Sequence, residues 1–434
     1  MTLLIISPDY ASHLFPLATV GTAWAEAGER VVVASGPATA AITSSFGFER
    51  ENLQLGRGSN PGVIRADEQP LGEDDALRGF FDATRRGMVE TLRFQAQARQ
   101  SDLLWNPVET ARAVQRLVAR VRPDQVIVDH LAFSARLALS SAGIRHADVV
   151  LGHPSALSVG AEVYGYPSTW PRCFEPDAAG LGRLHALCEV VRDSFTAQWN
   201  EALAVLDPGA TPSADAFGES GDLLLLNYPG ALHDERRTAL LPAHSFLGSA
   251  VRAEAFDPEV DTWISGSAAP IVYVSFGSFL SVRSDVLARV VAALRGLDVR
   301  VAIALGSTSP AELGPIPRTW LVRGFLPQVT LLASAALAVS HGGNNSVTEA
   351  MTAGVPLLVL PFSTDQFAGA AALEVAGYGV ALDPNAAPVG ALREAVVELL
   401  TLEGEARSGL DRLSTTLGGG AGPRCARTRV LAVS

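Results

Sequence analysis

One stretch of the sequence, residues 322–380, combines glycines and polar side chains in a pattern suited to binding an anion. A short apolar run over residues 336–339 predicts a strand, and a helix-compatible segment begins a few residues after it. Between the two lie His341, Gly342 and Gly343, and the helix-compatible segment begins with Asn344, Asn345 and Ser346. The start of a helix carries unpaired N–H groups and partial positive charge, and glycines let the backbone approach a ligand closely. This turn therefore favours a phosphate group.

A carboxylate and an amide follow the next apolar run. Residues 355–360 predict a second strand, and Asp365 and Gln366 come shortly after its end. Both side chains can bind sugar hydroxyls. In open parallel sheets, ligands bind outside the carboxyl ends of the strands, so the two polar groups are expected at one site. A glycine turn alone is common in α/β proteins, and Asp365 alone can cap the following helix, so the interpretation depends on the whole constellation.

This constellation resembles the nucleotide-sugar signature of inverting glycosyltransferases, a family that includes plant and animal UDP-glycosyltransferases and bacterial antibiotic glycosyltransferases. The resemblance is carried by the run from His341 to Glu349, by Gly354-Val355-Pro356, by Pro361, by Asp365-Gln366 and by the upstream Phe325-Leu326-Pro327-Gln328. It implies a GT-B fold, in which two Rossmann-like, doubly wound α/β domains face each other across a cleft. The acceptor side comes first in the chain and the donor side second.

The resemblance also implies a catalytic base in the N-terminal half. His13-Leu14-Phe15-Pro16 is similar to the family's His-x-x-Pro motif, and Asp129 matches the aspartate that orients this histidine. A histidine with a pKa near 6.5 suits proton abstraction at neutral pH, and a neighbouring carboxylate stabilises the imidazolium. Taken alone, His13 is typical of a surface residue and Asp129 of a helix N-cap. His130 is a weaker candidate for the base, and His153 is expected to be structural or to form a wall of the acceptor pocket.

For the nucleotide, the resemblance assigns stacking on the base to Phe325, its edge to Gln328, and the ribose hydroxyls to Glu349. The family commonly has Trp where this chain has Phe325, and the smaller ring predicts weaker stacking. A carboxylate accepts two neighbouring hydroxyls, and deoxyribose lacks the 2′,3′-diol, so Glu349 favours a UDP-sugar over a dTDP-sugar. The alternative for Glu349 is a cap or a salt bridge of its helix.

The diphosphate and the sugar are assigned to the remaining residues of the signature. The resemblance implies that the diphosphate contacts His341, Gly343, Asn345 and Ser346, with Ser278 as a weaker contact, and that the sugar's 3- and 4-hydroxyls contact Asp365 and Gln366. The sequence has no Asp-x-Asp metal motif, so helix-end amides and these side chains would carry the leaving group's charge. We expect no metal and no cofactor beyond the donor.

Composition limits the other functions open to the chain. A net charge of −12 argues against nucleic acid as a partner. Every basic residue is Arg, and the lack of Lys excludes a Walker P-loop, a Schiff-base lysine and pyridoxal phosphate. Three cysteines without metal spacing indicate a reducing compartment. Without a signal-peptide pattern or a membrane-length apolar run, the expected protein is cytoplasmic, as a monomer or homodimer.

Elements that position the base are expected in a β-α-β unit at the start of the chain. The pattern predicts a strand over residues 2–7, a helix from about 17 to 27 and a strand over 30–35, with His13 in the loop before the helix. This unit opens an N-terminal acceptor-binding domain at 1–250. The mostly helical region at 76–122 is expected to form either a wall of the acceptor pocket or a pair of helices on the protein surface.

The donor half is expected to follow a linker at 249–259. A strand over 271–275 opens a C-terminal nucleotide-sugar-binding domain at 262–412. A C-terminal tail at 413–434 contains glycine-rich residues 418–423, which predict a flexible stop.

These observations together predict an inverting, metal-independent transfer of a sugar from a nucleotide-diphosphate donor to a hydroxyl of a small hydrophobic secondary metabolite. A dTDP-deoxysugar-dependent antibiotic glycosyltransferase is the nearest alternative. A sugar-nucleotide epimerase is disfavoured by the His13-x-x-Pro16 element, and a non-catalytic auxiliary protein by the intact donor signature. A nicotinamide oxidoreductase is disfavoured because no Gly-x-Gly-x-x-Gly follows the first strand.

Overall fold

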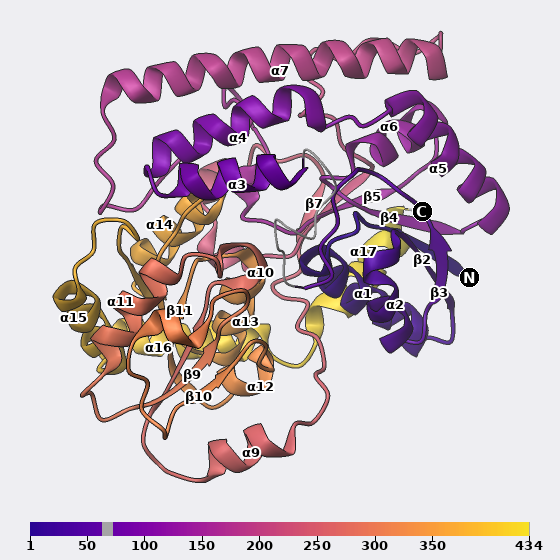
Figure 1. Ribbon diagram of the computed structural model, residues 1–434. Helices are drawn as coiled ribbons and strands as arrows, with labels where there is room; N and C mark the ends of the chain where they lie inside the picture. The colour runs from indigo at the N-terminus through magenta and orange to yellow at the C-terminus, as the bar shows by residue number, and fades with distance from the viewer. Residues whose placement is uncertain (63–72, 434) are drawn as a thin grey trace.

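Two parallel sheets, one in each half of the chain, form two lobes of the molecule (Figure 1). The computed structural model describes residues 1–62 and 73–433, except for the side chains of residues 73, 74, 101, 102 and 278. Both sheets are covered by helices on both faces. Within the described residues, no helix combines the length and the apolar character that a membrane crossing requires.

The N-terminal sheet has seven strands in the order β3-β2-β1-β4-β5-β6-β7, all parallel. The strands are β1 (Thr2–Ile6), β2 (Arg30–Ser35), β3 (Glu49–Asn52), β4 (Gln125–Asp129), β5 (Ala147–Val150), β6 (Leu223–Leu226) and β7 (His244–Phe246). The central strands are continuous apolar runs because helices bury both of their faces. The direction of winding reverses between β1 and β4.

The C-terminal sheet repeats this plan with six parallel strands in the order β10-β9-β8-β11-β12-β13. The strands are β8 (Ile271–Ser275), β9 (Arg300–Ala304), β10 (Leu321–Arg323), β11 (Ala335–Ser340), β12 (Leu357–Val359) and β13 (Gly379–Ala381). Here the winding reverses between β8 and β11. The protein therefore has the two facing Rossmann-like domains that the sequence predicted.

The helices connect the strands and cover the sheets. In the first lobe they are α1 (Ala11–Glu26), α2 (Ala40–Ser45), α3 (Glu73–Thr84), α4 (Met88–Asp102), α5 (Pro107–Val121), α6 (Phe133–Ser141), α7 (Ala178–Leu206) and α8 (Glu235–Thr238). The later ones are α9 (Pro258–Ser265), α10 (Gly277–Leu280), α11 (Ser284–Leu294), α12 (Gln328–Leu332), α13 (Asn344–Ala353), α14 (Gln366–Ala376), α15 (Val389–Leu400), α16 (Gly404–Leu417) and α17 (Ala421–Val433).

Helices α3 and α4, which belong to the first lobe, reach over the cleft to the second. Figure 1 shows them above the second lobe, with the long α7 running along the top. The buried Arg283 donates from Nη1 to the Thr84 carbonyl at 3.1 Å, and Arg85 forms an ion pair with Asp285 at 3.1 Å. These contacts hold the helical region against both lobes, so it encloses the cleft rather than forming a separate surface pair.

The prediction of a flexible stop at residues 418–423 is wrong, because a helix begins at Ala421. Helix α17 packs against α1 of the first lobe (Figure 1). Small apolar residues spaced by four, Gly422, Ala426 and Val430, form its buried stripe. Gly419 and Gly420, with φ of +79° and +65°, make the turn that redirects the chain. The domain boundaries predicted near residues 250, 262 and 412 stay predictions.

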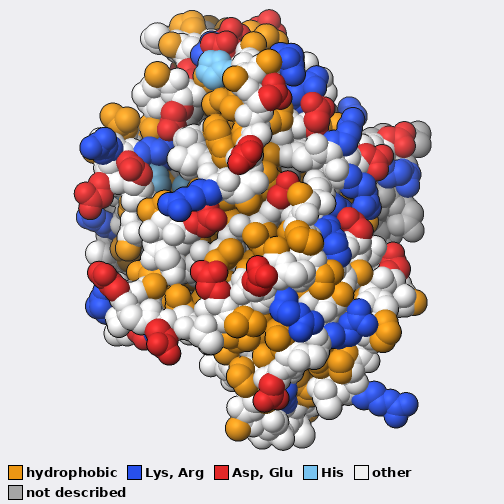
Figure 2. Space-filling model, turned by 90° about the vertical axis from the view of Figure 1, so that its left-hand side faces the viewer, with side chains coloured by type: hydrophobic (Ala, Val, Ile, Leu, Met, Phe, Trp, Pro, Cys, Tyr) orange, Lys and Arg blue, Asp and Glu red, His pale blue; other side chains and the backbone are white. Residues whose placement is uncertain are grey.

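The surface carries charges of both signs. On the face drawn in Figure 2, Arg side chains lie among Asp and Glu side chains, with hydrophobic side chains between them.

Candidate active site

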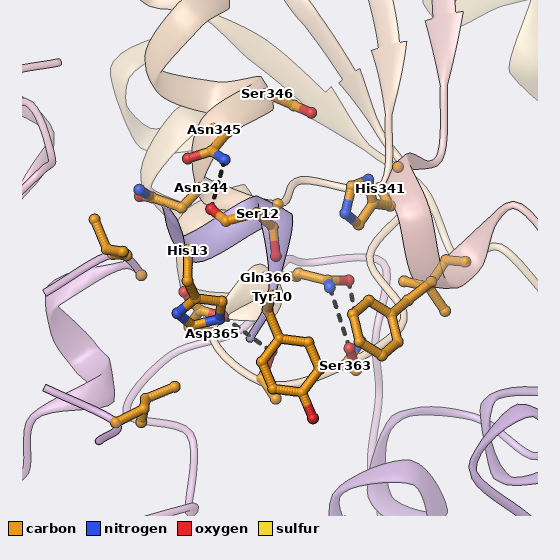
Figure 3. Close-up of a pocket in the computed structure, with 18 of the residues that line it drawn as sticks. Tyr10, Ser12, His13, His341, Asn344, Asn345, Ser346, Ser363, Asp365 and Gln366 are labelled. Atoms are coloured by element: carbon orange, nitrogen blue, oxygen red, sulfur yellow. Dashed lines mark hydrogen bonds between the residues drawn. The ribbon is translucent and has the colours of Figure 1, made fainter. Parts of the chain in front are cut away.

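A cavity of about 700 Å³ lies between the lobes, and residues of both lobes line it. It sits at the carboxyl ends of the strands at which each sheet reverses its winding, β1 and β4 in one lobe and β8 and β11 in the other. Ligands bind at such switch points because the loops diverge there and leave a crevice. Figure 3 shows the candidate residues of both lobes around this space.

His13 and Asp129 form a hydrogen-bonded pair on the first lobe's side of the cavity. His13 Nδ1 lies 2.7 Å from Asp129 Oδ2, and the other carboxylate oxygen accepts the Leu131 N–H at 2.9 Å. Asp129 is fully buried, whereas the His13 side chain is 24% exposed and lines the cavity. With Nδ1–H donating to the carboxylate, Nε2 keeps its lone pair and can accept a proton.

The local position of His13 corrects the sequence prediction. Helix α1 begins at Ala11 rather than near residue 17, so His13 belongs to its first turn and not to a loop. Pro16 lies further along α1, inside the helix, where a proline leaves the carbonyl four residues earlier without its usual N–H partner.

The electrostatics of the pair suit a base. Burial lowers the pKa of His13, but the charge and hydrogen bond of Asp129 and the charge of Asp365 outweigh burial and raise it above 6.5. Burial raises the pKa of Asp129, and the charge and hydrogen bond of His13 more than reverse this, so Asp129 is a carboxylate at neutral pH. In contrast, burial lowers the pKa of His130 to about 4. His130 is therefore a much weaker base than His13.

Pro16 also explains how the lobes meet beside the base. In a regular helix the Ser12 carbonyl would accept the N–H of residue 16, but proline has none. The Ser12 carbonyl instead accepts from Asn345 Nδ2 of the second lobe at 3.0 Å (Figure 3). The His-x-x-Pro element and the start of α13 are thus in direct contact.

The glycine turn after β11 has the predicted form. Gly342 has φ of +81°, and α13 begins at Asn344, directly after Gly343. A Cβ on Gly343 would lie 2.5 Å from His341 Nε2, and one on Gly277 2.8 Å from His341 Cε1. Only glycines therefore fit around the His341 ring. No side chain caps the start of α13, so its first amides are available to an anion.

The charge state of His341 follows from its burial, which lowers its pKa to about 4. The ring is therefore neutral near pH 7. It can offer one N–H to a phosphate oxygen but no positive charge. Asn345 and Ser346 line the same part of the cavity.

Asp365 and Gln366 both line the cavity, and both are already held by the protein. Asp365 Oδ2 accepts the His153 N–H of the first lobe at 2.6 Å and does not cap α14. Gln366 Oε1 accepts the Phe362 N–H at 3.0 Å, and its Nε2 donates to Ser363 Oγ at 3.1 Å. The carboxylate of Asp365 has lone pairs left for a sugar hydroxyl, and the Gln366 amide has one N–H left.

Of the residues predicted to contact the nucleotide, some line the cavity and others do not. Phe325 is 70% exposed and lines the cavity, so its ring face is available for stacking. Gln328 lines the cavity, but its amide contacts Glu349 and Tyr273. Glu349 is buried behind Gln328 and Arg252 and does not line the cavity. The side chain of Ser278 lies outside the described residues. The roles of all these residues stay predictions.

Sequence reasoning missed two arginines of the cavity wall. Arg252, in the linker between the lobes, pairs with Glu349, and Arg99 of α4 lies over the Tyr164 ring at 5.1 Å. No local pattern marks either arginine, because each reaches the cavity only through the fold. The acceptor side is otherwise largely apolar, with Leu77, Phe80, Leu92, Phe94, Leu131 and Tyr166. Among the described residues, no group of three His, Cys, Asp or Glu is arranged to hold a metal ion.

Comparison with known proteins identifies the class. Residues 228–408 match the family described as UDP-glucoronosyl and UDP-glucosyl transferase. The chain is 29% identical to demethyllactenocin mycarosyltransferase of Streptomyces fradiae over 334 residues, which cover 75% of this chain and 66% of that protein. It is 31% identical to the NDP-glycosyltransferase YjiC of Bacillus licheniformis over 153 residues. That match covers 35% of this chain and only 39% of the relative.

Solved structures extend the likeness to the whole chain. Spinosyn forosaminyltransferase SpnP superimposes with a TM-score of 0.69 at 19% identity, covering all of both chains. Glycosyltransferase VinC in complex with dTDP gives a TM-score of 0.67 at 19% identity, covering 100% of this chain and 99% of VinC. Such a likeness shows the GT-B fold. The likeness to the UDP-glucoronosyl and UDP-glucosyl transferase family is carried by residues 228–408, in a chain of GT-B fold.

Proposed function

We propose that the protein is an inverting glycosyltransferase that moves a sugar from a nucleoside-diphosphate donor to a hydroxyl of a small, largely hydrophobic acceptor. The single observation that carries this proposal is the His13–Asp129 pair, which faces the glycine turn of the second lobe across one cavity. A base and an anion site are the two parts that such a transfer needs, and each comes from a different lobe.

In the proposed reaction, His13 Nε2 takes the proton of the acceptor hydroxyl while the acceptor oxygen bonds to the anomeric carbon of the sugar. The bond from that carbon to the diphosphate oxygen breaks on the opposite face, so the configuration inverts. Asp129 stays ionised and stabilises the imidazolium. The amides at the start of α13 and the neutral His341 receive the charge of the leaving diphosphate. One such preorganised donor contributes about 3 kcal/mol of transition-state stabilisation.

For the donor nucleotide, we propose a UDP-sugar first and a dTDP-sugar as the alternative. The family description favours UDP, and Glu349 favours it as well wherever a ribose reaches its carboxylate. The dTDP held by VinC, a protein of the same fold, supports the alternative. Acceptor choice follows from the cavity wall, whose apolar and aromatic side chains on the first lobe suit a hydrophobic ring system.

The test is a transfer assay with purified protein, UDP-glucose or dTDP-glucose, and a panel of hydroxylated aromatic and aliphatic acceptors. Mass spectrometry detects the glycoside, and released nucleoside diphosphate is counted in parallel. His13→Ala should lower transfer by about 100-fold or more yet bind the nucleotide as the wild type does. An isomerised sugar nucleotide without an acceptor would favour an epimerase. A protein that binds no nucleotide would favour the auxiliary role.

A further inference from the structure

Glu349, the residue predicted to hold the ribose, is closed off from the cavity by two side chains. Arg252 Nη1 lies 2.6 Å from Glu349 Oε1, and Gln328 Nε2 donates to Oε2 at 2.6 Å. Each carboxylate oxygen therefore already accepts one hydrogen bond, and the side chain is only 5% exposed. Arg252 and Gln328 line the cavity, whereas Glu349 does not. A ligand can reach Glu349 only if one of these two moves.

Arg252 is held in place by both lobes and by its own linker. Its Nη2 pairs with Glu254 Oε1 at 2.9 Å, and Glu254 Oε2 accepts the Thr330 N–H at 2.9 Å at the start of α12. On the other side, the guanidinium lies over the Phe15 ring of α1 at 5.2 Å. The linker is thus attached through Arg252 to the helix that carries His13 and to the helix that carries Glu349.

The charge balance makes Arg252 a strong competitor for Glu349. Burial raises the pKa of Glu349, and the Arg252 charge and the Gln328 hydrogen bond act against this. A buried carboxylate needs a charged or multiply hydrogen-bonded partner, and removal of that partner is strongly unfavourable. A ribose hydroxyl donates a hydrogen bond but brings no charge. Binding of ribose to Oε1 therefore has to offset the loss of an ion pair.

We propose that Arg252 competes with the donor's ribose for Glu349, and so determines how well the protein distinguishes ribonucleotides from 2′-deoxyribonucleotides. The inference rests on the proposed donor site and deepens it. With Arg252 in place, the advantage of a 2′-hydroxyl is largely lost, because only the fraction of molecules with a free Glu349 can use it. A donor that does engage Glu349 releases the linker from α13, which couples nucleotide recognition to the connection between the lobes.

The experiment compares the affinities of UDP, dUDP and dTDP by calorimetric titration. UDP and dUDP differ only in the 2′-hydroxyl, and dUDP and dTDP only in the methyl group of the base. Arg252→Met removes the competitor and keeps an apolar stem against Phe15. Arg300→Met is the matched control, because Arg300 lies over the Trp263 ring at 4.0 Å and does not line the cavity.

Arg252→Met should raise the ratio of UDP to dUDP affinity by about tenfold, the worth of one hydrogen bond to a charged group. Arg300→Met should leave the wild-type ratio unchanged, and adding Glu349→Gln to Arg252→Met should remove the gain. If Arg252→Met does not fold, Arg252→Gln serves instead, with a smaller rise because its amide can still bind Glu349. Hydrogen exchange on the wild type gives a second reading: UDP should increase exchange in residues 250–255 more than dUDP does.

Two results would overturn the inference alone. An unchanged ratio in Arg252→Met means that Arg252 does not compete, and a lower ratio means that Arg252 itself binds the ribose. If none of the three nucleotides binds the wild type, the donor site of the proposed function fails as well. The outcomes therefore separate failure of the competition from failure of the glycosyltransferase proposal.

Discussion

Asp129→Asn tests the proposed base most directly. The carboxylate holds His13 Nδ1 at 2.7 Å and is fully buried. A hydrogen bond to a charged group contributes about 1.5–3 kcal/mol. In the transition state His13 becomes an imidazolium, so this stabilisation is realised where it lowers the barrier. Because each 1.36 kcal/mol of barrier changes the rate tenfold, losing this hydrogen bond should lower the variant's kcat by about 10- to 150-fold.

The pH dependence gives the sign of the effect. As the proposed base, His13 has to be neutral to accept a proton, and its folded pKa lies above 6.5 because the attraction of Asp129 and Asp365 outweighs burial. The acidic limb of the wild-type kcat/KM profile is therefore expected above pH 6.5. In Asp129→Asn, burial remains and the main attraction is lost, so the limb should move to lower pH.

The same shift makes a stability prediction. A raised histidine pKa contributes stability that is fully present below pH 6.5 and is lost as the pH rises through the folded pKa. The free energy of unfolding should therefore separate wild type from Asp129→Asn more at pH 6 than at pH 9. Urea unfolding at the two pH values measures the difference.

The control variant is Asp148→Asn, which removes another fully buried carboxylate of the same sheet. Asp148 pairs with Arg136 at 3.1 Å and does not line the cavity. It should lower stability without moving the acidic limb. A threefold change in kcat corresponds to less than half of the 1.36 kcal/mol that makes a factor of ten. If Asp129→Asn keeps kcat within about threefold of wild type and does not move the pH profile, His13 is not the base.

Two further predictions concern the cleft. Because its side chain is exposed, Phe325→Ala should change the free energy of unfolding by less than about 0.5 kcal/mol. If the ring stacks on the base, the same change should weaken nucleotide binding by about 1 kcal/mol. Equal losses of stability and of binding would contradict stacking. Pro16→Ala restores an N–H that competes with Asn345 for the Ser12 carbonyl, so kcat/KM should fall about fivefold, the worth of one net hydrogen bond of about 1 kcal/mol. An unchanged rate in Pro16→Ala would show that the Asn345 contact has no part in the reaction.

Several features could be predicted because their causes are local. Gly342 needs a left-handed backbone at a strand-to-helix turn, and the turn is written in consecutive residues. The apolar runs that become β1, β4, β8 and β11 predict buried parallel strands, and parallel strands place the residues that follow them at one edge. For this reason His13 and Asp129 could be expected at one edge of the first sheet, and His341 and Asp365 at one edge of the second. That the two edges face each other was implied by the family resemblance.

Other features depended on contacts between distant residues. The start of α1 was predicted too late, because Ala11, Ser12 and His13 carry no strong helix signal and Pro16 is typical of a first turn as well as of a break. The predicted flexible end was wrong because a stripe of small residues stabilises a helix only when a partner surface receives it. That surface is α1, nearly 400 positions earlier in the chain.

The sequence by itself determined the class of protein, since a motif of fixed order and spacing carries both the turn proposed to bind an anion and the strands on either side of it. Only the tertiary structure decided which partners the polar side chains have. Glu349 matches a ribose ligand in sequence, yet Arg252, 97 positions away, occupies its carboxylate. Asp365 matches a sugar ligand, and it also holds the backbone of His153 in the other lobe. The reason is physical: a carboxylate's partner is whichever donor the fold brings within about 3 Å, and that distance is set by the packing of whole domains.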